Sequence, residues 1–237
     1  MKAYKYCSIE HAIDNLVKHR IKISEYQDMN DPFELRGAVP SMPEFYAVFL
    51  DVITSLGVLC FSMTDSEPLL WSHYAEKHRG CCIGFEIDES VNTEKTIPVD
   101  KPKELFVNET RLEKFVLEAV KSGRFPIVEG DPELEKLSSD SEFDDITKAI
   151  MFSKYQRWSY EEEIRVMLKL IPEQKDGNLY FAEFDRLKPV EVLLGARCTD
   201  ADEERLRDAV NSYDPALPIV RTTLAVNEFR IIRRNKR

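Results

Sequence analysis

Residues 161–170 read Glu161-Glu-Glu-Ile-Arg-Val-Met-Leu-Lys-Leu170 and predict a β-strand with two different faces. Side chains alternate between the faces of a strand. One face is apolar and should pack on the core, with Ile164, Val166 and Leu168. The other face carries charges, from Glu161, Glu163 and Arg165. Because charges are costly to bury unpaired, we expect this face to line a cleft, with one glutamate contacting Arg165 and the other free to bond a ligand.

Short apolar segments predict further strands at residues 3–7, 21–24, 58–62, 81–87, 179–184, 190–194, 218–224 and 229–232. Helical patterns cover residues 8–19 (apolar at Ile13, Leu16 and Val17), 44–56, 103–122, 144–157 and 200–212. Another helix should begin at Ser66, with Pro68 in its first turn and Gly80 as its stop. We predict a single α+β domain over residues 1–237, built on a mixed, largely antiparallel sheet flanked by helices.

The composition excludes several classes of protein. The chain has 237 residues, enough apolar ones for a core, and a net charge of −10, which argues against a broad nucleic-acid surface. No apolar run approaches the roughly 20 residues that cross a bilayer, and no secretory signal is visible, so we expect a cytoplasmic protein with no membrane partner. The five cysteines lack CxxC spacing, which favours reduced, buried thiols and no metal site.

Two segments have a strongly biased charge. Residues 129–145 are acidic and contain Pro132, which predicts an exposed loop or insertion. Residues 230–237 form a basic tail, for which we expect a solvated end.

A second unusual segment runs from Cys60 to Gly80. Ser62 ends a predicted strand, where side chains often face a ligand. If the following segment is helical, Trp71, Tyr74 and His78 lie on one side of the helix. Their rings could then stack against a nucleobase or a nicotinamide ring. His73 lies on the neighbouring face of the same helix. The alternative is that both aromatic residues belong to the core, with their polar tips bonded to the backbone, and that His73 is a surface imidazole.

Several blocks together resemble a bacterial family described as domain of unknown function 2971. They are Asn30-Asp-Pro-Phe, Cys60-Phe-Ser, Trp71-Ser-His-Tyr-Ala with His78 and Gly80, Trp158-x-Tyr-Glu-x-Glu-x-Arg165, and Leu194-Gly-x-Arg197. The blocks run from Tyr4 to about Arg197 and cover most of the chain. This resemblance implies kinship without implying a particular chemistry.

A looser resemblance is to ADP-ribosyltransferase folds. These use a basic or aromatic residue on an early strand, a serine or tyrosine on a middle strand, and an E-x-E pair on a later one. Here the order would be Lys5 or Tyr6, then Ser62, then Glu161-x-Glu163, although the first strand lacks a clear Arg or His. The resemblance implies a split sheet, and NAD as substrate, with a glutamate offsetting the positive charge on the ribose as nicotinamide leaves.

Our first hypothesis is therefore a nucleotide- or NAD-handling enzyme of the ADP-ribosyltransferase or NAD glycohydrolase type, in a toxin or phage-defence setting with an antitoxin or other protein partner. The catalytic candidates are Glu163, Glu161, Ser62 and His73. The ligand-binding candidates are Tyr4, Tyr6, Asn30, Trp71, Tyr74, His78, Trp158 and Arg165. One alternative is a non-enzymatic module that binds a nucleotide, RNA or a protein in the same cleft. Another is phosphodiester hydrolysis with a divalent cation. The first hypothesis requires Ser62 and the carboxylates to face one hollow beside Trp71.

Overall fold

β-Strands are the commonest regular element in the computed structural model, which describes residues 1–31, 54, 56–99 and 151–234. The strands of the main sheet are β1 (Lys2–Cys7), β2 (Arg20–Glu25), β3 (Leu56–Ser62), β4 (Cys81–Ile87), β5 (Thr93–Lys95), β8 (Glu163–Lys169), β9 (Lys175–Asp176), β10 (Leu179–Glu183), β11 (Leu187–Leu194), β12 (Ile219–Leu224) and β13 (Ile231–Arg233). Two more strands, β6 (Ile97–Val99) and β7 (Ser153–Tyr155), pair only with each other in the described part of the chain.

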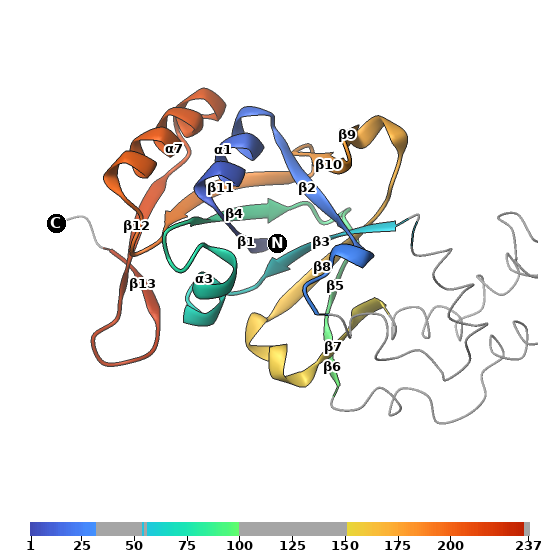
Figure 1. Ribbon diagram of the computed structural model, residues 1–237, viewed down its shortest axis with the longest axis horizontal. Helices are drawn as coiled ribbons and strands as arrows, with labels where there is room; N and C mark the ends of the chain where they lie inside the picture. The colour runs from blue at the N-terminus through green and yellow to red at the C-terminus, as the bar shows by residue number, and fades with distance from the viewer. Residues whose placement is uncertain (32–53, 55, 100–150, 235–237) are drawn as a thin grey trace, which may run out of the picture.

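The main sheet has the strand order β13-β12-β11-β4-β1-β3-β2-β10-β9 (Figure 1). β8 adds to β3 and in turn pairs with β5, so β3 lies between β8 on one side and β1 and β2 on the other. The pairs in this sheet are antiparallel except β11 with β12. The predicted α+β class and largely antiparallel sheet are confirmed.

Helices cover both faces of the sheet. The α-helices are α1 (Ile9–Val17), α3 (Pro68–Tyr74) and α7 (Asp200–Tyr213), and the short 3₁₀ turns are η1 (Tyr26–Asp28), η3 (Gln156–Glu161) and η4 (Pro172–Gln174). Ser8 caps α1 by accepting a hydrogen bond from the His11 amide. Of the three predicted apolar positions, Leu16 is buried, Ile13 packs partly against the core and Val17 is exposed. The other buried residues of α1 are Ile9, Ala12 and Asn15.

Two apolar clusters lie on opposite faces of the sheet, because alternate residues of each central strand point opposite ways. One cluster packs under α1 and α7 and includes Ile83 of β4. The other packs under α3 and includes Cys82, the adjacent residue of the same strand. Both faces are therefore buried at the centre of the sheet. All five cysteines are free thiols.

The helix predicted from Ser66 to Gly80 is shorter than expected. Glu67 caps it in place of Ser66, and α3 ends at Tyr74. Glu76, Lys77 and His78 then adopt left-handed backbone angles, with φ of 48°, 57° and 69°. This turn packs against the end of β11, where the Arg197 amide donates to the His78 carbonyl oxygen. Tertiary contacts thus override the helical pattern.

Other predictions differ or fall outside the described residues. Residues 151–152 are helical, but Ser153–Tyr155 form a strand where the helix 144–157 was predicted. The predicted helix at 103–122, nearly all of that at 44–56, and the acidic stretch 129–145 lie outside the described part. Among the helices that are described, none combines the length and apolar character needed to cross a bilayer.

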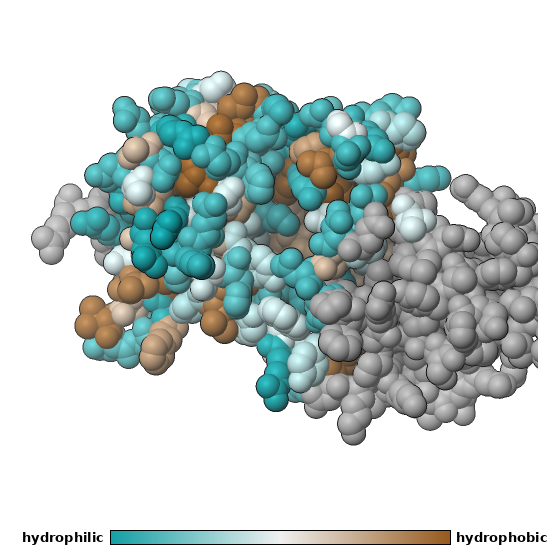
Figure 2. Space-filling view, viewed as in Figure 1, coloured by the Kyte–Doolittle hydropathy of each residue, from teal (hydrophilic) through white to brown (hydrophobic). Residues whose placement is uncertain are grey.

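The basic tail is not simply a solvated end. Its first residues form β13, the outermost strand of the sheet on that side. The loop from β12 to β13 exposes the apolar side chains of Val226 and Phe229. Figure 2 shows hydrophobic (brown) atoms on the surface at this loop.

Candidate functional site

A cavity of about 240 Å³ lies where β1 and β3 diverge. Within these two strands only Tyr4 and Ser62 are paired, whereas β2 pairs with β3 at Val58 and Gly57. Seven of the predicted site residues line the cavity: Tyr4, Tyr6, Asn30, Ser62, Tyr74, Glu161 and Glu163. The sheet therefore brings together segments that are about 160 residues apart in the sequence.

Ser62 lies on the central one of the three strands that meet at this site. It lies in register with Tyr4 of β1 on one side and with Glu163 of β8 on the other. Its hydroxyl donates to the Glu161 carbonyl oxygen at 2.7 Å and accepts from the Thr64 amide at 3.1 Å. These bonds fix the hydroxyl and leave one lone pair for a ligand.

The carboxylates belong to a buried group of four charges. Glu161, Glu163, Lys154 and Arg165 are 5%, 6%, 9% and 1% exposed. Lys154 Nζ lies 2.5 Å from Glu161 Oε2 and also contacts Glu163 Oε2. Arg165 Nε donates to Glu163 Oε1 at 2.8 Å. The two cations balance the two anions, which makes burial of all four tolerable.

This pairing corrects the expected division of roles between the glutamates. Glu163 contacts Arg165 as predicted for one of them, but Glu161 is not free, because Lys154 and the Tyr74 hydroxyl both bond its carboxylate. Lys154 was missed in the sequence, where its segment has a helical pattern. One signal was available: two buried glutamates need more positive charge than Arg165 alone supplies.

The ionisation states of the cavity wall follow from these contacts. Burial by itself raises the pKa of Glu163, but the charges of Arg165 and Lys154 and their hydrogen bonds outweigh it and lower the pKa to about 2. Burial and the negative charge of Glu161 raise the pKa of Tyr74, against a smaller opposing effect of a hydrogen bond with Asn30. At neutral pH the cavity therefore presents an ionised Glu163 and a neutral Tyr74, whose hydroxyl donates to Glu161 Oε1 at 2.8 Å.

Trp158 and His73 lie beside the cavity without lining it. The ring of Trp158 is 6.0 Å from that of Tyr160 and 6.4 Å from that of His73, and Lys154 Nζ lies 5.8 Å from the Trp158 ring. His73 is exposed on the protein surface. These rings form an aromatic margin next to the buried charges.

Three other predicted ligand-binding residues do not line the cavity either. Trp71 is 0% exposed, meets Tyr6 edge-on at 5.2 Å and donates its indole N–H to the Asp65 carbonyl oxygen at 2.7 Å, so it belongs to the core and the hollow does not lie beside it. His78 lies in the left-handed turn, off the expected side of the helix, and burial and the charge of Arg197 lower its pKa. Arg165 is buried behind Glu163 and supports that residue.

Comparison with known families bears on this site directly. Residues 70–166 match a family described as Protein of unknown function (DUF2971). The match supports the resemblance to this family that the sequence blocks indicated. The DUF2971 match begins in α3 and ends in β8, and it contains Tyr74, Lys154, Glu161 and Glu163, whereas β1 and Ser62 precede it. No curated protein and no solved structure matches the chain.

The described residues of the protein show no group of three or more His, Cys, Asp or Glu side chains placed to hold a metal ion. At the carboxylates, the neighbouring positive charges are the ammonium of Lys154 and the guanidinium of Arg165. The geometry therefore gives the divalent-cation hypothesis no support.

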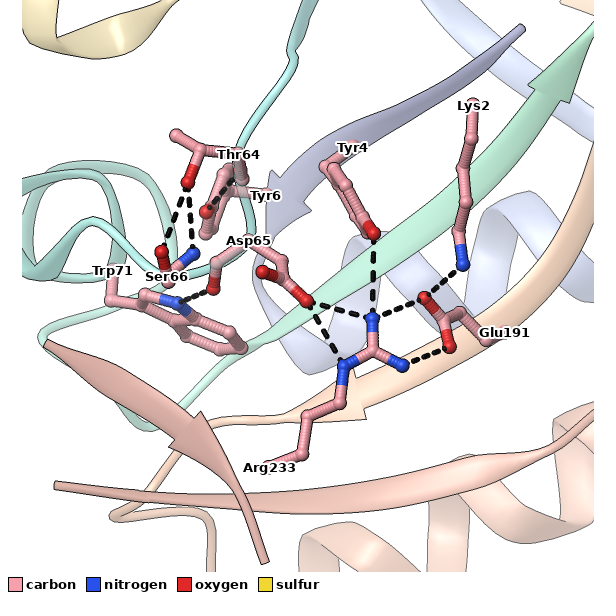
Figure 3. A network of polar contacts seen from close by, with 9 residues as sticks. All are labelled: Lys2, Tyr4, Tyr6, Thr64, Asp65, Ser66, Trp71, Glu191 and Arg233. Atoms are coloured by element: carbon pink, nitrogen blue, oxygen red, sulfur yellow. Dashed lines mark hydrogen bonds and ion pairs between the residues drawn. The ribbon is translucent and has the colours of Figure 1, made fainter. Parts of the chain in front are cut away.

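A second polar network, which the sequence did not predict, holds the loop that follows Ser62 (Figure 3). Arg233 of β13 bonds the Asp65 carboxylate at 2.7 Å and both oxygens of Glu191 at 2.7 Å. Lys2 also pairs with Glu191, at 2.6 Å. The Ile231 amide donates to the Ser66 carbonyl oxygen. The C-terminal hairpin thus supports one wall of the cavity from outside.

Proposed function

We propose that the cavity is the active site of an enzyme that cleaves the bond between nicotinamide and ribose in NAD, as an ADP-ribosyltransferase or an NAD glycohydrolase. One observation carries the proposal. Ser62 lies in register between Tyr4 on β1 and Glu163 on β8, so the three strands of the ADP-ribosyltransferase resemblance are direct neighbours around an opening in the sheet.

The residues suit this chemistry. As the glycosidic C–N bond breaks, nicotinamide leaves with the bonding electron pair and the ribose carbon becomes positively charged. The ionised Glu163 and the adjacent Glu161 offset that charge. Water then adds to the carbon and releases a proton, giving ADP-ribose. In the transferase case an acceptor nucleophile adds instead.

The cavity volume indicates which part of NAD can enter the site. Pockets that enclose a drug-sized ligand are about 300–1,000 Å³, and this cavity is about 240 Å³. It suits the nicotinamide ring and its ribose, with Tyr4 and Tyr74 as neighbouring rings. The adenosine half of NAD would remain outside the cavity.

The test is nicotinamide release from NAD, followed by chromatography, with labelled NAD to detect transfer to an acceptor. We expect Glu163→Gln to lower the rate at least about 100-fold, as when a group that stabilises transition-state charge is removed. Glu191→Gln is the matched control, because Glu191 is also buried and also pairs with one arginine and one lysine, yet does not line the cavity. Rates are normalised to the folded fraction. Equal rates for wild type and Glu163→Gln would refute the catalytic assignment.

A non-enzymatic binding module is the second candidate. It is favoured by the hydrogen bonds of the carboxylates, since all four oxygens of Glu161 and Glu163 already contact protein donors. Such a site would bind a nucleotide, an RNA end or a protein segment without turning it over. We would then expect Tyr74→Ala to weaken binding of NAD in calorimetry while no nucleotide is converted by the wild type.

A further inference from the structure

We infer that Glu161, Glu163 and the rings beside them form a binding site for an organic cation, and that Lys154 is an internal cation that occupies it here. We call these residues the cation site. Such a site would select molecules with a positively charged head group.

The contacts of Lys154 are those of a bound ligand cation. Its ammonium touches one oxygen of each glutamate, Glu161 Oε2 at 2.5 Å and Glu163 Oε2. The other two oxygens are held in place by the Tyr74 hydroxyl and by Arg165. The two carboxylates are thus preorganised by neutral and cationic donors around a central position that takes a positive charge.

Aromatic rings complete the cation site. The Trp158 ring lies 5.8 Å from Lys154 Nζ, and Tyr160 lies beside Trp158 at 6.0 Å. Tyr74 adds a third ring, which lines the cavity. Carboxylates combined with aromatic faces are the means by which proteins recognise quaternary ammonium and similar cations.

Lys154 and Glu163 belong to different sheets, whereas Glu161 follows Lys154 on the adjoining turn η3. Lys154 is carried by β7, which pairs with the three-residue β6, whereas Glu163 begins β8 of the main sheet. A lysine ammonium is also a compact charge on a flexible four-carbon stem. A ligand cation that enters the cavity can therefore take the same oxygens while the lysine stem swings aside, with no change in the main sheet.

One consequence rests on the proposed function. The nicotinamide ring of oxidised NAD is a pyridinium cation, and the ring of the reduced form is neutral. The cation site would then favour the oxidised dinucleotide over the reduced one.

The test uses Lys154→Ala with two probes of similar shape, the N-methylnicotinamide cation and neutral nicotinamide. The substitution vacates the cation site, so we expect N-methylnicotinamide to bind the variant at least about tenfold more tightly than the wild type in calorimetry. The cation should also raise the thermal midpoint of the variant, and nicotinamide should not. Lys5→Ala is the matched control, because Lys5 also lines the cavity but donates to the Cys60 carbonyl oxygen, and it should gain no affinity.

The remaining outcomes are decisive as well. Equal affinity of the cation for wild type and Lys154→Ala, or an equal gain with nicotinamide, would overturn the inference. Lys154→Met keeps the stem and serves if the alanine variant does not fold. If neither folds even with the cation present, Lys154 is an irreplaceable structural ion and the inference is wrong. Cation binding without NAD turnover would remove only the proposed enzyme function, and turnover without cation binding would remove only the cation site.

Discussion

Glu163→Gln offers a quantitative test of the buried charges, independent of any activity. The folded protein holds the pKa of Glu163 at about 2, against an ordinary value of 4.5. A depression of this size corresponds to about 3 kcal/mol of folding free energy. Glutamine keeps the shape of the side chain but removes the charge that Lys154 and Arg165 bond. We therefore expect the variant to be about 3 kcal/mol less stable at pH 7.

The pH dependence gives the sign of the effect. Because the folded-state pKa is lowered, the contribution of Glu163 is fully present above pH 4.5 and is lost as the pH falls towards 2. The difference in unfolding free energy between wild type and variant should thus shrink by about 2 kcal/mol between pH 7 and about pH 3.

Urea denaturation at a series of pH values measures this difference directly. Glu204→Gln is the control, because it makes the same chemical change at an exposed position and should leave stability within about 0.5 kcal/mol of wild type. A difference for Glu163→Gln that stays constant from pH 7 to pH 3 would refute the conclusion that Lys154 and Arg165 hold this carboxylate ionised.

Three further predictions concern the frame around the cavity. Arg233→Gln loses the ion pairs with Asp65 and Glu191. Because the Arg233 side chain is 42% exposed, we expect urea denaturation to show a modest decrease of about 1–2 kcal/mol in unfolding free energy. An unchanged unfolding free energy would mean that β13 does not support the loop after Ser62. Gly195→Ala would place a Cβ 2.2 Å from the His78 carbonyl oxygen, so we expect at least about 3 kcal/mol of destabilisation or failure to fold, and a stable variant would contradict the packing of the left-handed turn. A thiol-reactive disulfide reagent should react slowly with the native protein but should label all five cysteines in denaturant. Four of the thiols are buried in the native protein, and the pKa of the fifth, Cys60, is raised by burial and by the charge of Glu163. Rapid reaction of the native protein would contradict this prediction.

The parts of the fold that the sequence predicted are those governed by local periodicity. Strand alternation placed Ile164 and Val166 on the core face and Glu163 and Arg165 on the other, and the structure has this arrangement. The position of Ser62 at the end of a strand was predicted in the same way. These features depend on neighbouring residues, and a strand has only two faces to choose between.

The parts that were missed depend on contacts between distant residues. Lys154 has no local pattern that marks it as a partner of Glu161 and Glu163, because β7 exists only through its pairing with β6. α3 ends at Tyr74 because the turn that follows it packs against the end of β11. Helix propensity depends on local sequence and does not include this contact. Trp71 follows the alternative stated for it, a core aromatic residue whose indole N–H bonds a backbone carbonyl oxygen.

The location of its ion pairs determines how this protein should respond to ionic strength. Arg205 of α7 and Glu10 of α1 join the two outer helices at 2.7 Å, with both side chains more than half exposed. At 1 M salt the screening length is about 3 Å, so this link should weaken. The Lys154 ammonium is buried, and buried ion pairs are screened much less than exposed ones. Concentrated salt should therefore loosen the outer helical layer first and leave the cavity wall in place.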